Sequence, residues 1–394
     1  VEGVERYDRE MVERLVRLSG VTPGSDFDLA KLQNARQRIA DSGYFDSVHL
    51  SVEPEEGQPS APVVVQLREG QRQKLVLGVG GSTDSGARLS VEHTHHRVPG
   101  IGWRALSKVQ LERDDQTLST DWSAPVDDKG WRWITSASVS RQIDGFDTTT
   151  SQRLRLGQAQ TNPALDRSFF LQYDRAQVDN SVLKSLTVQA EASLTANYAW
   201  TYRRFDSTPF PNSGYGVSVE LGAGTTLEGT RQPFGRTLVR WLSYWPLGSH
   251  AETGSDNTPL GVARPATTSS TSAGRLVLRL EGGAVWSRID TPVPETQLFL
   301  TGGDTSVRGY GLRDIGLPQA DGGVAPGRYL AVTSLEWQRP IWRNGVRSPW
   351  ETAVFVDGGA VADQAGDLKP RWGVGGGVRY NSPVGPLRLD LAYG

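Results

Sequence analysis

Residues 186–198 read Leu-Thr-Val-Gln-Ala-Glu-Ala-Ser-Leu-Thr-Ala-Asn-Tyr, an unbroken alternation of apolar and polar side chains. Successive side chains of an extended strand point to opposite faces, so this run has one apolar face and one polar face. A helix would instead repeat its apolar residues every three or four positions. The run therefore predicts a long β-strand that separates two different environments.

Alternating runs of similar length recur from residue 73 to the end of the sequence, with turn signals between them. A strand of an ordinary sheet has about 5–6 residues, whereas a tilted strand that crosses a membrane has about 9–11. The runs here have the longer, membrane-crossing length. We expect about fifteen strands, at residues 74–82, 86–95, 102–112, 116–124, 130–142, 150–160, 167–177, 185–203, 214–226, 236–246, 273–286, 329–338, 350–359, 371–380 and 386–393.

A soluble β-sandwich and a transmembrane β-barrel both use alternating strands, and the tryptophans favour the barrel. Most lie near the ends of predicted strands, where membrane barrels carry aromatic girdles, although ordinary core packing would also place some there. These tryptophans are Trp103, Trp122, Trp131, Trp133, Trp200, Trp241, Trp245, Trp286, Trp337, Trp342 and Trp372. Single-chain bacterial barrels have an even number of strands, so we expect sixteen, with the closing strand missing from this sequence.

Composition narrows the function classes further. The formal net charge of −2 argues against nucleic acid as a partner. The absence of cysteine excludes disulfides and thiolate metal sites. No apolar run has the length of a membrane-spanning helix. The start at Val1 lacks the basic segment of a secretory signal, so we take the chain to be processed or trimmed.

Residues 1–72 follow a helical period instead. Met11, Val12, Leu15 and Val16 form one apolar stripe. A second helix is predicted after the segment 25–28, Ser-Asp-Phe-Asp, a variant of the capping box. Its expected core face is Leu29, Leu32, Ala35, the stem of Arg36 and Ile39. Two extended runs, 48–52 and 63–67, complete a small α+β domain, and we place the barrel at residues 73–394.

A long connection rich in glycine and proline runs from Ser287 to Arg328, and residues 302–311 within it read Gly-Gly-Asp-Thr-Ser-Val-Arg-Gly-Tyr-Gly. Connections of this length are uncommon unless they are functional or disordered. An ordinary surface turn is the simpler interpretation of these letters alone. A second insertion, Gly248–Gly274, is predicted to be a disordered periplasmic loop, and we assign it no function.

The segment Val307-Arg308-Gly309-Tyr310 resembles the conserved loop motif of the outer-membrane assembly-factor (BamA/TamA) superfamily. Residues 351–359, 373–380 and 382–392 fit the same family, and the segments 302–304, 327–330 and 334–337 are most similar to its TamA branch. The N-terminal region resembles a POTRA domain, through residues 43–48 and 63–70. Its expected role is client binding at a strand edge, and a plain spacer is the equal alternative.

The resemblance implies a protein of the Gram-negative outer membrane whose N-terminal domain lies in the periplasm. It implies a factor, not an enzyme, that inserts β-barrel or autotransporter clients, with phospholipid transport as a second activity and a TamB-like inner-membrane-anchored partner. A BamA-like insertase and a two-partner-secretion transporter are the alternatives, followed by a passive porin. The motif arginine, Arg308, is expected to meet Asp357 and Glu336. One side of a lateral gate would be formed by Lys74, Leu75, Val76, Leu77, Gly78, Val79 and Gly80.

No cofactor, metal or catalytic residue is predicted. The segment 93–96, His-Thr-His-His, would suit a metal, but no carboxylate at a suitable spacing supports this, and a strand-end turn is the better interpretation. The glycine-rich segments 78–86 and 373–377 lack the Lys-Ser/Thr and the strand–helix context of a phosphate-binding loop. A Gly-x-Ser-x-Gly nucleophile elbow is also absent from the sequence.

Overall fold

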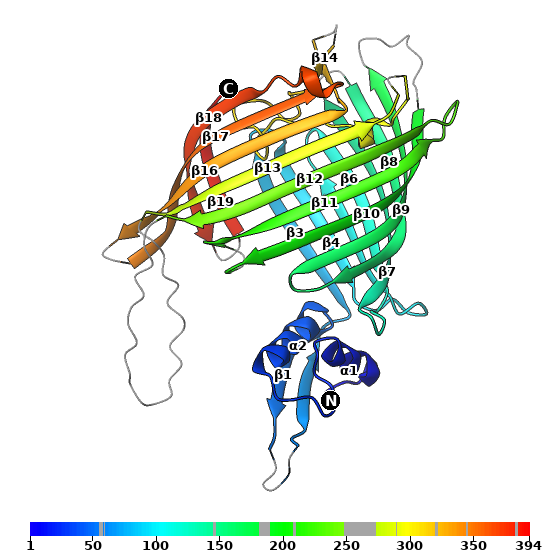
Figure 1. Cartoon of the computed structure of the whole chain (residues 1–394), viewed down its shortest axis with the longest axis vertical. Coiled ribbons are helices and arrows are strands. Elements are labelled where there is room, and N and C mark those ends of the chain that lie inside the picture. Colours follow the sequence, from blue (N-terminus) through cyan, green and yellow to red (C-terminus); the bar gives the residue numbers. More distant parts are fainter. Residues whose placement is uncertain are drawn as a thin grey trace.

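The computed structural model shows a curved antiparallel sheet of 15 strands above a small α+β domain (Figure 1). It describes residues 1–394 except 55–57, 59, 145–146, 181–189, 208–209, 248–272, 289, 320–321, 344–345 and 383–384. Of the predicted insertion 248–274, only the last two residues are described. The first four residues of the run 186–198 also lie outside the described residues. The strands curl around a central lumen, so the predicted membrane barrel is confirmed.

Each strand of the large sheet pairs with the next strand of the sequence. At the long loop, which contains β14 and β15, the pairing continues from β13 directly to β16. The strands β4 and β11 have the predicted bounds. The strands are β3 (Gln73–Ser82), β4 (Gly86–His95), β5 (Arg104–Leu111), β6 (Asp115–Ser123), β7 (Trp131–Asp144), β8 (Asp147–Thr161), β9 (Leu165–Asn180), β10 (Ala190–Phe205), β11 (Gly214–Thr226), β12 (Pro233–Pro246), β13 (Arg275–Trp286), β16 (Tyr329–Arg343), β17 (Val346–Ala362), β18 (Arg371–Ser382) and β19 (Gly385–Tyr393).

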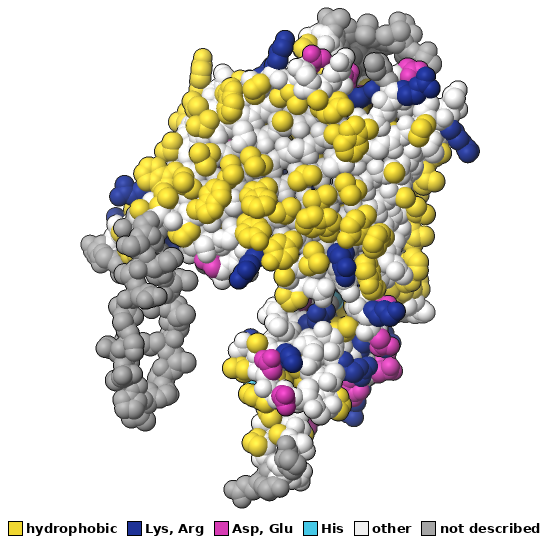
Figure 2. Space-filling view, viewed as in Figure 1, with side chains coloured by type: hydrophobic (Ala, Val, Ile, Leu, Met, Phe, Trp, Pro, Cys, Tyr) yellow, Lys and Arg dark blue, Asp and Glu magenta, His cyan; other side chains and the backbone are white. Residues whose placement is uncertain are grey.

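The two faces of the sheet differ as the alternation predicts. On β10, the side chain of Leu194 is 43% exposed and that of Thr195 is 1% exposed. On β16, Leu335 is 45% exposed, whereas Glu336 is 8% exposed. Apolar side chains cover the outer surface (Figure 2), as expected for a wall that faces lipid. Exposed tryptophans on that wall include Trp133, Trp245, Trp286, Trp337, Trp342, Trp350 and Trp372.

Within the described residues, β3 and β19 are the outermost strands of the sheet and share no ladder. β3 pairs only with β4, and β19 pairs only with β18. Leu75, Leu77 and Val79 on β3 are strongly exposed. The backbone groups on an unpaired strand edge are costly in lipid. We call the place where β3 faces the C-terminal strands the seam.

The N-terminal domain consists of α1 (Arg9–Arg17), α2 (Leu29–Asp41), β1 (Phe45–Val52) and β2 (Val63–Glu69). Its core contains Tyr7, Met11, Val12, Leu15, Ile39, Phe45, Val65 and Leu67. Neither helix is long and apolar enough to span a membrane; this holds for the described part of the chain.

Two details predicted for α2 are wrong. The helix begins at Leu29, and its N-cap is Asp28, whose carboxylate accepts hydrogen bonds from the N–H groups of Ala30 and Lys31. Ser25 therefore lies outside the helix, so the predicted capping box does not form. Leu29 is 59% exposed, because the first turn of the helix extends beyond the elements that pack against its buried face. Arg36 is exposed as well.

The domain lies against the barrel turns on its side of the sheet. Arg14 on α1 donates from Nε to Asp128 at 2.8 Å and from Nη1 to the carbonyl of Val126 at 3.1 Å. Arg38 on α2 donates from Nη2 to Asn162 at 3.1 Å. The ring of Tyr44 packs edge-on against His96 in the turn after β4. Contacts to three separate turns hold the domain beneath the lumen.

Glu69 fastens the first residues of the chain to this domain. Its carboxylate accepts from the N–H groups of Glu5, Arg6 and Tyr7 and from Nε of Arg6. Burial alone would raise the pKa of Glu69, but these hydrogen bonds outweigh burial and lower it. The stabilisation is therefore complete above the unfolded-state pKa of about 4.3 and is lost as the pH falls through the lower, folded-state pKa.

We expect Glu69→Ala to destabilise this attachment by about 2 kcal/mol, as for charged hydrogen bonds. Hydrogen exchange at pH 7 should show lost protection at residues 5–7, with the amides of α2 unchanged. Glu53→Ala, which removes a carboxylate from just beyond β1, is the control. Retained protection at residues 5–7 in Glu69→Ala would contradict the prediction.

Candidate functional site: a loop folded into the barrel

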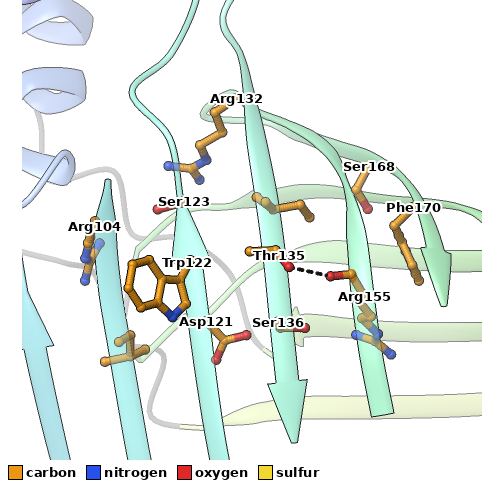
Figure 3. Close-up of a pocket in the computed structure, with 12 residues that line it drawn as sticks. Arg104, Asp121, Trp122, Ser123, Arg132, Thr135, Ser136, Arg155, Ser168 and Phe170 are labelled. Atoms are coloured by element: carbon orange, nitrogen blue, oxygen red, sulfur yellow. Dashed lines mark hydrogen bonds between the residues drawn. The ribbon is translucent and has the colours of Figure 1, made fainter. Parts of the chain in front are cut away.

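The inner wall of the barrel is polar, and several arginines point into the lumen. Arg104, Arg132 and Arg155, from β5, β7 and β8, line a cavity of about 320 Å³ together with Asp121, Thr135, three serines and four apolar side chains (Figure 3). Arg155 donates to Gln172 at 2.6 Å and lies over the ring of Phe170. Such a surface suits a lumen that contains water.

The loop between β13 and β16 folds into this lumen. It contains the short helix η1 (Glu295–Gln297) and the two-residue strands β14 (Leu317–Pro318) and β15 (Val324–Ala325). Isolated bridges, Phe299 with Gly327 and Thr301 with Ile315, join its outgoing and returning segments. Its apolar side chains form one cluster with β12, β13, β16 and β17, namely Val293, Phe299, Val307 and Ile315 with Phe234, Leu238, Val285, Leu330, Val332 and Val361.

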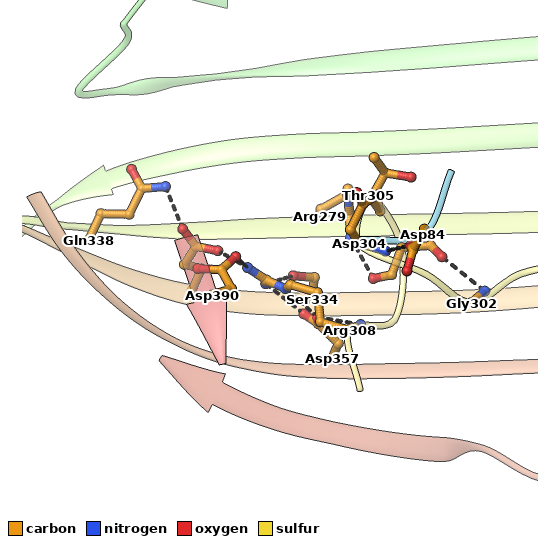
Figure 4. Close-up of polar contacts among 12 residues, drawn as sticks. Asp84, Arg279, Gly302, Asp304, Thr305, Arg308, Ser334, Gln338, Asp357 and Asp390 are labelled. Atoms are coloured by element: carbon orange, nitrogen blue, oxygen red, sulfur yellow. Dashed lines mark hydrogen bonds and ion pairs between the residues drawn. The ribbon is translucent and has the colours of Figure 1, made fainter. Parts of the chain in front are cut away.

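Arg308, at the tip of the loop, contacts acids from three strands (Figure 4). Its Nε and Nη2 donate to the two oxygens of Asp357 on β17, at 2.7 and 3.0 Å. Its Nη1 donates to Glu336 on β16 at 2.7 Å and to Asp390 on β19 at 3.3 Å. The guanidinium also lies over the ring of Phe355, with 3.3 Å between its Cζ and the ring centroid. Both predicted acid partners are thus at hydrogen-bond distance.

These contacts keep Arg308 charged although it is 8% exposed and Asp357 is 0% exposed. Burial by itself would lower the pKa of Arg308, but the hydrogen bonds to Asp357 and Glu336 raise it above its usual value. A bidentate arginine–carboxylate pair fixes direction as well as distance. Since a buried ion pair is poor evidence for stability, we interpret the pair as a device that fixes the position of the loop tip.

Sequence reasoning missed two members of this cluster, Arg379 and Asp390. Arg379 on β18 donates to Glu336 at 3.1 Å and forms an ion pair with Asp390. With Arg308, two arginines therefore face three carboxylates. Both missed residues occupy inward positions of predicted strands, and that alternation was the available signal.

Glycine at position 373 allows the tip to approach β18 closely. A Cβ atom at Gly373 would overlap the carbonyl oxygen of Arg308, and one at Gly359 would overlap a methyl group of Val307. We expect Gly373→Ala to push the loop tip from the wall and to increase protease cleavage within residues 302–311. Gly282→Ala is the matched control, because a Cβ atom there would meet no atom within 4 Å. Equal cleavage of the two variants would contradict this role.

The loop also contacts the other end of the sheet. The N–H of Asp304 donates to Asp84, in the turn after β3, at 2.5 Å. Arg313 forms an ion pair of 3.2 Å with Asp115 at the start of β6. Arg313 has a φ of 58°, the only positive φ of a non-glycine residue in the described ranges, a strained conformation that its surroundings must maintain. One loop thus joins the first and the last strands.

The remaining predicted residues are placed as follows. Lys74, Leu75, Val76, Leu77, Gly78, Val79 and Gly80 all lie on β3, at the seam. Val307 is buried, and Tyr310 donates to the carbonyl of Trp372 on β18. Gly309 has a φ of 97° and lies against residues 393 and 394. His93 contacts Gln73, and the described residues contain no His/Asp/Glu group suited to a metal.

The fold and the site define the class of the protein: an outer-membrane β-barrel with a loop folded into its lumen and a small domain on the periplasmic side. The chain belongs to the Omp85 superfamily, whose domain matches residues 98–394. A POTRA family, described as the surface antigen variable number repeat, matches residues 1–70. The protein is accordingly located in the outer membrane, with its POTRA domain in the periplasm.

Known proteins with similar sequences include the outer membrane protein assembly factor BamA of Nitratidesulfovibrio vulgaris, 24% identical over 100% of this chain and 47% of that protein. The chloroplastic outer envelope protein 80 of Arabidopsis thaliana is 36% identical over 30% of this chain and 15% of its own length. The chain therefore spans about half of the BamA relative and a smaller part of the chloroplastic one.

Solved structures share the fold. BamA from Haemophilus ducreyi lacking POTRA domains 1–3 superposes with a TM-score of 0.71 at 18% identity, covering 99% of this chain and 79% of that one. CdiB from Acinetobacter baumannii gives a TM-score of 0.61 at 14% identity, covering 100% and 73%.

Proposed function

We propose that this chain is an outer-membrane protein assembly factor that inserts β-barrel or autotransporter clients through a lateral gate between the first and last strands of the barrel, with β3 on one side. Its membership of the Omp85 superfamily and its likeness to BamA support this class. The exposed edge of β3 offers unpaired backbone groups to a client strand, the mode of recognition called β-augmentation. The gate residues 74–80 would provide that edge.

The observation that best supports this function is that the loop between β13 and β16 contacts both sides of the seam. Arg308 binds the C-terminal strands through Asp357, while Asp304 binds the turn after β3 through Asp84. A loop attached to both sides of a seam can hold the seam closed without a continuous ladder. Opening then requires the loop to release one side, and client strands would enter at that moment.

Reconstitution in liposomes tests this function. A urea-denatured eight-stranded outer-membrane barrel is added as the probe, and its folded, heat-modifiable form is followed over time. We expect faster folding than in empty liposomes or in liposomes that contain a passive porin. A large, steady conductance without faster folding would instead support a porin.

Within the superfamily, we propose a TamA-like role in which a TamB-like inner-membrane-anchored protein is the partner and phospholipid transport is a second activity. The sequence of the segment 302–304 supports the TamA branch. A BamA-like insertase is the alternative that the sequence similarity to BamA supports, and a two-partner-secretion transporter is the other alternative. Co-purification with a TamB-like protein, as opposed to a secreted partner, would distinguish these roles.

A further inference from the structure

A second polar cluster holds the same loop at a different part of the barrel wall. Its centre is Asp174 on β9, which is 0% exposed. Asp174 accepts from Nε of Arg153 on β8 at 2.7 Å and from the side-chain amides of Gln172 and Gln297, both at 2.5 Å. Gln297 belongs to η1, in the outgoing segment of the loop, and is 3% exposed. All three partners are donors, and together they use both carboxylate oxygens of Asp174.

Further contacts place η1 against β8 and β12. The carbonyl of Gln297 accepts from Nε of Arg236 on β12 at 3.0 Å, and the carbonyl of Thr296 accepts from Arg153 at 3.4 Å. Glu295 accepts from the hydroxyl of Thr149 at 3.1 Å. Each residue of this short helix is thus held by an inward side chain of the wall.

This cluster is separate from that of Arg308. The sheet order places β10, β11, β12 and β13 between β9 and β16. Two parts of one loop are therefore bound to two distant parts of the wall. Between them lies Phe299, which packs into the apolar cluster together with Val307 and is bridged to Gly327 on the returning segment. A shift at Gln297 would therefore move the packing on which the tip rests.

We propose that Asp174 is a positioning residue for the loop tip, and that the loop is a strut across the lumen with one end bound at Asp174 and the other at Asp357. The strut keeps the tip at the wall and narrows the lumen. This inference concerns the resting barrel and does not rest on the proposed insertion activity. Its experiments contain no client, so their failure is separable from a failure of that activity.

A single cysteine introduced at either end of the strut reports on the exposure of that end. The labelling is specific because the chain contains no cysteine of its own. Val293→Cys lies beside η1 and Val307→Cys lies at the tip, and the native side chains are 4% and 0% exposed. The rate of maleimide labelling of each reporter is measured in the full chain in liposomes, together with single-channel conductance. Gln297→Ala is the first variant, because it removes one hydrogen bond and leaves Asp174 paired with Arg153.

We expect Gln297→Ala to increase labelling at both reporters by at least about fivefold, and to raise conductance. Gln297→Glu should have a larger effect, because it brings a second carboxylate against Asp174 in a buried site. The exchange Asp174→Asn with Gln297→Glu restores an amide–carboxylate pair with its roles reversed, and Arg153, which donates to the adjacent carbonyl of Thr296, stays beside the new carboxylate. The exchanged protein should label within about twofold of the unaltered protein.

Faster labelling at Val293→Cys alone would overturn the proposal, because η1 would then be held locally without positioning the tip. Unchanged labelling at both reporters in Gln297→Ala would overturn it too, as would an exchange that labels no more slowly than Gln297→Glu. Gln319→Ala, which alters a glutamine near the β14–β15 hairpin of the same loop, is the matched control and should label like the unaltered protein.

Discussion

Arg308→Ala is expected to reduce the stability of the barrel by about 3–5 kcal/mol, the usual cost of removing one partner from a buried ion pair. Asp357 is completely buried, and Arg308 donates to both of its oxygens. Removal of the guanidinium leaves that carboxylate without its cation. Glu336 and Asp390 lose less, because Arg379 still binds both. The loop tip should therefore leave the wall at β17.

Heat-modifiable migration in gels measures this effect, since a folded barrel migrates differently from an unfolded one. Arg308→Ala should lose its folded form at a temperature that the unaltered protein withstands, and its assembly activity should fall. Arg308→Lys should recover only part of the loss, because an ammonium group lacks the bidentate fork. Arg288→Ala is the control, because Arg288 lies in the same loop with 81% of its side chain exposed.

Removal of Asp357 as well should recover part of the loss, because the unpaired buried charge is then absent. The double variant Arg308→Ala with Asp357→Ala should thus be more stable than Arg308→Ala alone. A double-mutant cycle isolates this coupling. If Arg308→Ala and Arg288→Ala melt together, the tip is not held by the arginine.

The strands and their faces were predictable because a period of two, sustained over a membrane-crossing length, has few alternatives. The same parity placed Glu336 on the inner face beside Ser334 and Gln338, and both of these contact the cluster. A partner for Arg308 on β17 was predictable only from the family resemblance. The resemblance named Asp357, whereas parity alone would also have allowed the inward residue Glu351.

Contacts between distant strands were not predictable in this way. Arg379 and Asp390 are inward residues, but the sequence contains many inward charges, and their pairing depends on the register of β18 with β19. Asp174 contacts η1 only because the loop crosses the lumen. Asp84 lies in a turn, where no periodicity marks a direction. The error at Leu29 has a similar origin, since a helical stripe does not show where the covering elements end.

Opening of the seam should increase when the loop loses its hold on the first strands. The double variant Asp84→Ala with Arg313→Ala removes the acceptor of the Asp304 N–H and the ion pair with Asp115. The hydrogen bond to Asp84 is exposed and contributes about 0.5–1.5 kcal/mol, and the partly exposed ion pair contributes about 1 kcal/mol or less. Since about 1.4 kcal/mol corresponds to a factor of ten, the open population should rise about tenfold.

Single-channel recording in planar bilayers measures that population as the frequency of brief openings. Asp114→Ala is the control: it removes a carboxylate from the turn between β5 and β6, next to Asp115, where it pairs with the adjacent Arg113. The double variant should keep the heat resistance that Arg308→Ala loses, because the cluster around Asp357 is intact. Frequent openings together with retained heat resistance would therefore separate two functions of one loop, with Arg308 fixing the tip and Asp84 and Asp115 closing the seam. Openings as rare as those of Asp114→Ala would contradict this division, and the closure of the seam would then have to come from the strand edges themselves.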